Sequence, residues 1–207
     1  MQTKAHWEHV YGTRSAASVS WFQPHAHRSV ELIRLTGAGQ DGAIIDVGGG
    51  ASTLVDDLLA AGHTDLTVLD LSRAALDVAR ARLGAQADRV TWLADDITTA
   101  ALPRHRYDVW HDRAVFHFLT SDEARAAYVR AVLRAVRPGG SVIVATFAED
   151  GPEQCSGLPV RRYSADALHA EFGTPFTLLR HEREAHATPF GTVQQFVYCL
   201  CRKDAAD

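Results

Sequence analysis

The sequence predicts an α/β fold in which a doubly wound, mostly parallel sheet carries helices on both faces. Short apolar runs alternate with amphipathic helical stretches up to residue 147, and such alternation is typical of parallel strands joined by crossover helices. The last two predicted strands, 176–184 and 193–201, have no helix between them, so we expect them to pair antiparallel. Three consecutive glycines after the first strand leave room for a ligand beside the backbone.

The composition sets the broad class of protein. Of the 207 residues, 46% are hydrophobic and 22% are charged, which is typical of a globular domain with a substantial core. The formal net charge of −4 gives no basic footprint for nucleic acid. No apolar run has the length of a membrane span. We therefore expect a single domain that acts without nucleic acid or membrane, as a monomer or weak dimer.

The cysteines and the first residues indicate the compartment. The three cysteines are an odd number without CxxC spacing, which fits a reduced protein better than a disulfide scaffold. The opening residues lack the apolar stretch of a signal peptide. We expect a cytoplasmic protein.

Two helices are predicted before the first strand. Residues 3–12 carry apolar side chains at helical spacing. Pro24 suits the first turn of a second helix, which ends before Gly37. The first strand follows at 43–47.

Serine and glycine residues mark the predicted starts and ends of the next helices. Ser52 and Ser72 are predicted to cap the helices after the first and second strands, and Gly62 and Gly84 to close them. The second to fifth strands are predicted at 65–69, 89–94, 107–111 and 141–147.

The second half of the chain contains a capped helix and a long loop. Thr120 and Glu123 have the spacing of a capping box before a helix. Residues 148–162 are rich in proline and glycine and form a long loop, a kind of segment that is often functional. A short helix is predicted at 164–171.

Polar residues gather at the predicted carboxyl ends of four strands. Gly48–Gly50, Asp70, Asp96 and Asp112 each fall at such an end. Ligands of doubly wound sheets bind along this edge, where the winding reverses. The convergence of four strand ends predicts a binding site there.

The spacing of these residues favours an adenosine-containing ligand. Asp70 lies twenty residues after Gly50, the spacing of a carboxylate that accepts both ribose hydroxyls. Asp96 and Ile97 could place a carboxylate and an apolar wall beside an adenine. The third glycine of a dinucleotide fingerprint and the lysine of a P-loop are both absent. The sequence thus predicts an adenosine pocket without phosphate-binding machinery.

These motifs resemble those of class I, seven-stranded S-adenosylmethionine-dependent methyltransferases. IIDVGGGAS resembles the glycine motif of the family, VLDLS its ribose-binding strand, ADDI its adenine motif, YDVWHDRAVFHFL its fourth motif, and RPGGSVIVATF the turn into the fifth strand. The resemblance implies the strand order 3-2-1-4-5-7-6, with the last strand antiparallel, and S-adenosyl-L-methionine as the methyl donor.

Two further features of the resemblance bear on the substrate. The opening HWEHVY…VSWFQ is similar to the lid of thiopurine methyltransferase-like and elongation-factor lysine methyltransferase-like proteins. The fourth motif lacks the Asn/Asp-Pro-Pro-aromatic sequence of enzymes that methylate amino groups of DNA bases and glutamine, which argues against those substrates.

Within the single predicted domain, the chain is expected to divide into four segments. They are a lid (1–23), a cofactor-binding core (24–147), a substrate loop and helix (148–174) and terminal strands (175–202).

The candidate site residues follow from the motifs and from this resemblance. Expected cofactor contacts are Trp7, Tyr11, Asp46, Gly48, Gly49, Gly50, Asp70, Leu71, Asp96, Ile97 and His111. Candidates for orienting or deprotonating the acceptor are Asp112 and His117. Expected substrate contacts are Trp21, Phe22, Arg113, Cys155, Arg162 and Tyr163. No metal site is predicted.

Structural alternatives remain open for several of these residues. Asp112 and Arg113 could form an ion pair at a helix cap, and His117 could be a satisfied core histidine. The N-terminal aromatic residues could be ordinary packing, and Cys155 an ordinary loop thiol.

The leading functional prediction is methyl transfer to a small thiol, amine or hydroxyl compound in an enclosed pocket, a reaction that depends on alignment and exclusion of water. The alternatives are a protein lysine methyltransferase and a regulatory protein that binds S-adenosylmethionine without turnover. A fourth is methylation of a metalloid or thiol, with Cys155, Cys199 and Cys201 as soft ligands.

Overall fold

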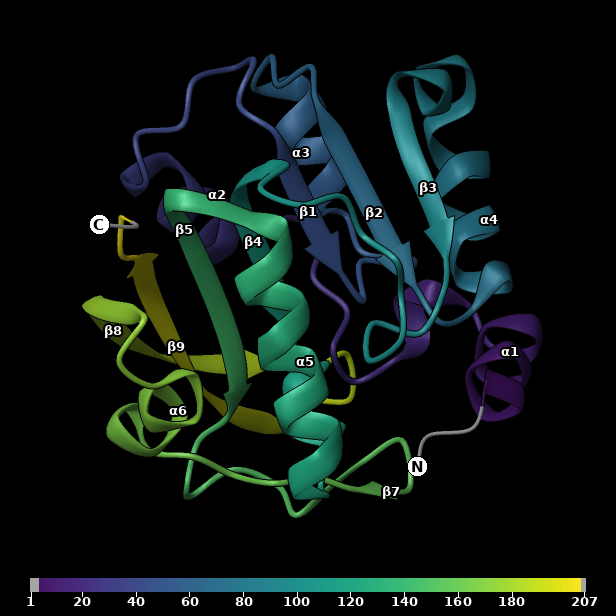
Figure 1. Ribbon diagram of the computed structural model, residues 1–207. Coiled ribbons are helices and arrows are strands. Elements are labelled where there is room, and N and C mark those ends of the chain that lie inside the picture. The colour runs from purple at the N-terminus through teal and green to yellow at the C-terminus, as the bar shows by residue number, and fades with distance from the viewer. Residues whose placement is uncertain (1–3, 206–207) are drawn as a thin grey trace.

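The computed structural model, which describes residues 4–205, is built around a seven-stranded sheet (Figure 1). The strands lie in the order β3-β2-β1-β4-β5-β9-β8, and β9 runs antiparallel to both of its neighbours. Numbered along the chain within this sheet, that order is the predicted 3-2-1-4-5-7-6, so the predicted fold is confirmed. The strands are β1 (Ile44–Val47), β2 (Leu66–Asp70), β3 (Val90–Ala94), β4 (Tyr107–Arg113), β5 (Val136–Phe147), β8 (Phe176–Ala187) and β9 (Val193–Lys203).

Helices cover both faces of the sheet, as Figure 1 shows. One face carries α2 (His27–Leu35), α3 (Leu54–Ala60) and α4 (Arg73–Leu83), and the other carries α5 (Asp122–Ala135) and α6 (Ala165–Phe172). The helix α1 (Lys4–Thr13) lies next to α4, beyond the carboxyl ends of β2 and β3. Successive side chains of a strand point to opposite faces. Accordingly Ile44 joins the core under α2–α4, and Ile45 joins the core under α5 and α6. All residues of β1 and β2 are buried, as strands covered on both faces require.

The serine caps and glycine stops largely follow the prediction. Ser72 caps α4, where its hydroxyl accepts a hydrogen bond from the Ala75 N–H at 3.2 Å. Ser52 lies one residue before the N-cap of α3, and its hydroxyl accepts from the Leu54 N–H at 3.1 Å. Gly62 and Gly84 both have positive φ at the ends of α3 and α4.

Two predicted helix starts are wrong. The helix α2 begins at His27, three residues after Pro24. The cap of α5 is Ser121, whose hydroxyl accepts from the Ala124 N–H at 3.3 Å, and not Thr120. Thr120 and Ser121 are adjacent potential caps, so sequence alone could not choose between them.

The segment after β4 also differs from expectation. β4 continues to Arg113, and only the single turn Phe116–Phe118 is helical, with 3-10 geometry. Arg113 and His117 therefore do not share a face of one helix. The predicted loop 148–162 contains a small hairpin of β6 (Gln154–Cys155) and β7 (Leu158–Pro159). Within residues 4–205, no helix has the length and apolarity needed to cross a bilayer.

Candidate functional site

The triple glycine forms a turn that touches its neighbours so closely that side chains are excluded. Gly48 has a φ of +71°, and a Cβ there would overlap the Val115 side chain. A Cβ on Gly49 would overlap the Asp46 carboxylate, and one on Gly50 would overlap the Asp70 carboxylate. The glycines thus allow two carboxylates and the segment after β4 to meet at the end of β1.

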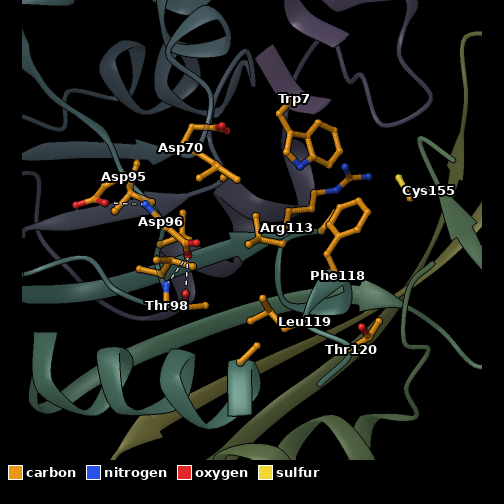
Figure 2. Close-up of a pocket in the computed structure, with 18 of the residues that line it drawn as sticks. Trp7, Asp70, Asp95, Asp96, Thr98, Arg113, Phe118, Leu119, Thr120 and Cys155 are labelled. Carbon is orange, nitrogen blue, oxygen red and sulfur yellow. Dashed lines mark hydrogen bonds between the residues drawn. The ribbon is translucent and has the colours of Figure 1, made fainter. Parts of the chain in front are cut away.

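A cavity of about 220 Å³ lies along this edge of the sheet (Figure 2). Figure 2 shows Asp70, Asp95 and Asp96 on one side of it, and Trp7, Phe118 and Cys155 on the other. The lining residues come from the lid, from the ends of β1, β2, β3 and β4, from the turn after β4, from the start of α5 and from β6. They are Trp7, Tyr11, Trp21, Val47, Gly48, Leu69, Asp70, Leu71, Asp95, Asp96, Ile97, Thr98, Arg113, Ala114, Val115, Phe118, Leu119, Thr120, Ser121, Ala124 and Cys155.

Asp70 has the properties expected of a ribose-binding carboxylate. It is 8% exposed at the end of β2, and its Oδ1 accepts a hydrogen bond from the Ser72 N–H at 2.8 Å. Its Oδ2 lies against the glycine turn. Burial raises the pKa of Asp70 to about 7, because charge is costly away from water. Hydrogen bonds from a diol would favour the ionised form.

The two acids after β3 differ in their partners. Asp96 accepts hydrogen bonds from the Thr98 N–H at 2.9 Å and hydroxyl at 2.7 Å, so it shapes its own turn. Asp95, which the sequence analysis did not select, accepts from the Asp96 N–H at 2.8 Å and also lines the cavity. Leu71 and Ile97 supply apolar wall on the same side. This side could hold a flat, polar-edged ring.

Asp46 belongs to a buried chain of three side chains. Its Oδ1 lies 2.7 Å from Nδ1 of His111, and Nε2 of His111 lies 2.9 Å from the Ser29 hydroxyl. The three residues come from β1, β4 and α2, and all line a second cavity of about 50 Å³. Tyr11, Trp21, Gly48 and Arg113 line both cavities. No sequence pattern marks Ser29, so the prediction missed it.

The N-terminal aromatic residues pack over the cavity. The Trp7 ring lies 5.3 Å from the Phe118 ring and 5.8 Å from the Trp21 ring, both edge to face. The Trp21 indole N–H donates to the Tyr11 hydroxyl at 3.1 Å, and burial raises the pKa of Tyr11 above its usual value. Phe22 lines the smaller cavity. The segment combines aromatic packing with a wall of the site, so the two sequence interpretations are compatible.

Arg113 connects the lid to the terminal strands. It donates to the Tyr198 hydroxyl at 2.9 Å and to the Trp21 carbonyl at 3.2 Å, and its guanidinium lies 3.5 Å from the Glu184 carboxylate. The guanidinium also stacks over the Phe196 ring at 4.3 Å. Its ion pair is therefore with Glu184 and not with Asp112. Arg113 lies where the two cavities meet.

Asp112 holds the backbone after β4 instead of facing either cavity. Its carboxylate accepts from the N–H groups of Val115 at 2.8 Å and Phe116 at 3.1 Å, and from the Tyr128 hydroxyl at 2.6 Å. Burial raises the pKa of Asp112 to about 7. These bonds press Val115 against Gly48, so Asp112 positions the turn.

His117 also lies outside both cavities. It is fully buried, and its Nδ1 accepts a hydrogen bond from the Phe147 N–H at 3.3 Å. Burial lowers the pKa of His117 to about 3, because the imidazolium form would be desolvated. The geometry favours the core-histidine interpretation.

Of the remaining residues predicted to contact the acceptor, one lines the larger cavity and two do not. Cys155 lines the cavity, and burial raises the pKa of its thiol to about 12. Arg162 pairs with Glu153 at 3.1 Å, and Tyr163 packs on the Phe116 ring at 5.9 Å. Neither residue lines the larger or the smaller of the two cavities. Phe118, Leu119, Thr120, Ser121 and Ala124 form a wall that the prediction missed, because it depends on where the turn after β4 leads.

The three thiols do not form one soft-ligand set. Cys155 belongs to the core under α2–α4, whereas Cys199 and Cys201 belong to the core under α5 and α6. Burial raises the pKa of both Cys199 and Cys201 to about 12. In the part of the chain that the structure describes, no group of three or more His, Cys, Asp or Glu side chains is placed to hold a metal ion.

The residues present fit an S-adenosyl cofactor. The glycine turn would be filled by any side chain, Asp70 presents a carboxylate oxygen beside it, and Leu71 and Ile97 supply apolar wall for an adenine. The smaller cavity offers the Asp46 carboxylate and the Arg113 guanidinium, which suit the ammonium and carboxylate of an amino-acid group. The two cavities, which share four lining residues, could therefore hold the two halves of the cofactor.

Comparison with known proteins supports this assignment. Residues 44–140 match the methyltransferase domain family. EEF1A lysine methyltransferase 2 of Danio rerio is 24% identical over 131 residues, which are 60% of this chain and 56% of that protein. The matched region thus spans little more than half of the relative.

Solved structures share the fold at low sequence identity. One, from a study of the conversion of a disulfide bond into a thioacetal group during echinomycin biosynthesis, has a TM-score of 0.78 and 22% identity, covering 98% of this chain and 93% of that chain. Another is a Burkholderia thailandensis 1,6-didemethyltoxoflavin-N1-methyltransferase with bound 1,6-didemethyltoxoflavin and S-adenosylhomocysteine. It has a TM-score of 0.66 and 20% identity, covering 94% and 81%. Residues 44–140 thus match the methyltransferase domain family, and the strand order together with these structures shows the seven-stranded fold of class I S-adenosylmethionine-dependent methyltransferases.

Proposed function

We propose that this chain transfers a methyl group from S-adenosylmethionine to a small-molecule nucleophile. The observation that carries the proposal is the cluster of aromatic side chains at one end of the larger cavity. Trp7, Phe118 and Trp21 pack edge to face there, and Trp7 is only 9% exposed. A pocket roofed in this way favours a compact, apolar or aromatic acceptor over an extended protein segment.

The residues of the chain divide the work of the reaction. S-adenosylmethionine supplies a methyl group that is already activated by its sulfonium charge. Asp70 and the wall of Leu71 and Ile97 would hold the adenosine, and the smaller cavity would hold the amino-acid group. The aromatic lid excludes water and orients the acceptor, and alignment of this kind can supply much of the rate.

The next question is which side chain could remove a proton from the acceptor. Cys155 and Tyr11 hold their protons at neutral pH because burial raises the pKa of each. His117 lies outside the cavity, and His111 has a partner on each ring nitrogen. The acceptor end thus offers no unpaired histidine among residues 4–205 to act as a base. This supports an acceptor that reaches the site as a nucleophile, such as a neutral amine or ring nitrogen or a thiolate.

A transfer assay tests the proposal. The purified chain is incubated with S-adenosylmethionine carrying a labelled methyl group, first with panels of small thiols, amines and hydroxyl compounds, then with lysine-containing proteins. Label in a small product, lost in Asp70→Ala, supports the proposal. Label found only in protein would overturn it.

Protein lysine methylation is the second candidate. The observation that favours it is the similarity to EEF1A lysine methyltransferase 2, at 24% identity. Under this candidate, a lysine side chain would have to pass the aromatic residues of the lid. Mass spectrometry of a protein acceptor would then show methyl-lysine. A chain that binds S-adenosylmethionine but labels neither panel would favour the regulatory alternative.

A further inference from the structure

The lid helix α1 is fastened to the cofactor-binding core through one carboxylate. Glu8 accepts hydrogen bonds from two N–H groups at the start of α4, that of Arg73 at 2.8 Å and that of Ala74 at 3.1 Å. α1 and α4 lie side by side (Figure 1). A carboxylate at a helix N-terminus is stabilised both by unpaired N–H groups and by the helix dipole.

The same turn of α4 is connected to the ribose carboxylate. The N–H of Ser72 donates to Asp70, the N–H groups of Arg73 and Ala74 donate to Glu8, and the N–H of Ala75 donates to the Ser72 hydroxyl. Of these four successive N–H groups, one donates to the Asp70 carboxylate, two donate to the lid, and one donates to the helix's own cap. An α-helix cannot satisfy these groups internally, so α4 lacks two of its partners whenever α1 lifts away.

The environment of Glu8 favours its charged, bonded form. Burial acts to raise the pKa of Glu8, but the hydrogen bonds from Arg73 and Ala74 outweigh burial and hold the pKa below its usual value. At neutral pH, the carboxylate therefore accepts both bonds.

A second contact holds the other side of α1. His6 Nε2 lies 3.2 Å from the hydroxyl of Ser156 in the turn of the β6–β7 hairpin. Between these two attachments, Trp7 reaches the cavity and packs on Phe118. The position of Trp7 is thus fixed by α4 on one side and by the hairpin on the other.

We propose that Glu8 is a positioning residue that latches the lid over the bound cofactor, and that breaking its bonds to α4 sets the rate at which cofactor and product leave. The proposal rests on cofactor binding alone and is independent of the acceptor. Glu8 lines neither cavity, so it acts through α4 and Trp7 without touching the ligand.

The test measures the binding kinetics of S-adenosylhomocysteine by stopped-flow fluorescence of the tryptophans. In Glu8→Ala, we expect the dissociation rate to rise about tenfold, as loss of charge-assisted hydrogen bonds would produce, with little change in the association rate. Glu8→Gln keeps an uncharged acceptor and should fall between Glu8→Ala and the wild type. His9→Ala, an exposed neighbour on α1, is the matched control and should behave as the wild type.

Limited trypsin digestion gives a second, independent measure. Arg14 directly follows α1, and bound S-adenosylhomocysteine should slow cleavage after Arg14 in the wild type but much less in Glu8→Ala. Unchanged dissociation in Glu8→Ala, or an equal rise in His9→Ala, would overturn the latch while leaving the proposed function intact. A wild type that fails to bind S-adenosylhomocysteine would overturn both.

Discussion

The two sides of the cavity, one proposed for the cofactor and the other for the acceptor, are built in different ways. The cofactor side draws on residues 46–98, where each polar group sits at the end of a strand and its place follows from the sheet. The acceptor side draws on α1, the turn after β4, the start of α5 and the β6–β7 hairpin, which lie far apart in sequence. Strand ends can therefore be located from sequence, whereas a wall assembled from loops is defined only in the folded chain.

The buried acids Asp70 and Asp112 show the same contrast at the level of single groups. Burial raises the pKa of each to about 7. Asp70 keeps one oxygen beside the glycine turn and lines the cavity, whereas both oxygens of Asp112 are bonded to the chain itself. Asp70 therefore has an oxygen available to a ligand, whereas Asp112 stabilises the turn after β4.

Gly48→Ala should have the largest effect on the cofactor side. The new Cβ would overlap Val115, and the φ of +71° is strained for alanine. We expect loss of S-adenosylhomocysteine binding by more than about 100-fold, since both penalties add at the site. Gly139→Ala is the matched control, because its φ is +75° with open space around it. It should cost only about 1 kcal/mol of stability, and calorimetry showing equal binding losses in both variants would contradict the argument.

Asp70→Asn should lower the affinity for S-adenosylhomocysteine without lowering the thermal stability of the chain. The amide can still accept from the Ser72 N–H, but it loses the charge, so we expect affinity for S-adenosylhomocysteine to fall tenfold or more. The folded-state pKa is raised, so the folded chain holds the proton more tightly than the unfolded chain. The stabilising contribution is therefore complete below pH 4 and is lost as pH rises toward 7. At pH 8, the variant should melt at or above the temperature of the wild type; a clear drop would contradict this.

The affinity of the wild type should depend on pH through the same group. Only the ionised Asp70 accepts both ribose hydroxyls, so affinity should rise as pH increases through about 7. Calorimetry between pH 5.5 and pH 8.5 measures the slope. Asp70→Asn should remove most of it, and an undiminished slope would assign the titration to another group, with Asp112 the first to examine.

His117→Asn should have a small effect on catalysis. The asparagine can keep an acceptor for the Phe147 N–H, but it leaves part of a buried site empty, at a cost of about 1–3 kcal/mol. We expect a lower melting temperature with kcat within about threefold of the wild type, since His117 lies outside both cavities. A kcat loss beyond 100-fold at an unchanged melting temperature would restore the catalytic interpretation.

Cys155→Ser should give the smallest change, confined to the acceptor side. The thiol lines the cavity and is protonated, so it supplies shape without charge. We expect the KM for the acceptor to change a few-fold while cofactor affinity stays constant. A change in cofactor affinity alone would mean that the two sides of the cavity are not separate.

The sequence predicted the fold and the position of the residues at the carboxyl ends of the strands. A buried strand followed by glycines and an acid has few possible structures, and Gly48, Asp70 and Ile97 line one cavity at the predicted edge of the sheet. Ser29 was missed because its role appears only when α2 packs against His111. The partners of Arg113 were missed because β4 runs two residues beyond its predicted end, which leaves Arg113 in the strand and facing Tyr198.

The place of β9 in the sheet has a consequence for synthesis of the chain. β9 follows β8 in sequence, yet it lies between β5 and β8 in space. On the ribosome, β8 is therefore finished before the strand that joins it to the sheet, and the edge of β5 stays open until β9 emerges. Tyr198, the partner of Arg113, arrives with β9. The strands β1 to β5 can pair during elongation, whereas Arg113 gains its Tyr198 partner only after β9 is made, and the open edge of β5 is the point at which a nascent chain is exposed to pairing with a neighbour.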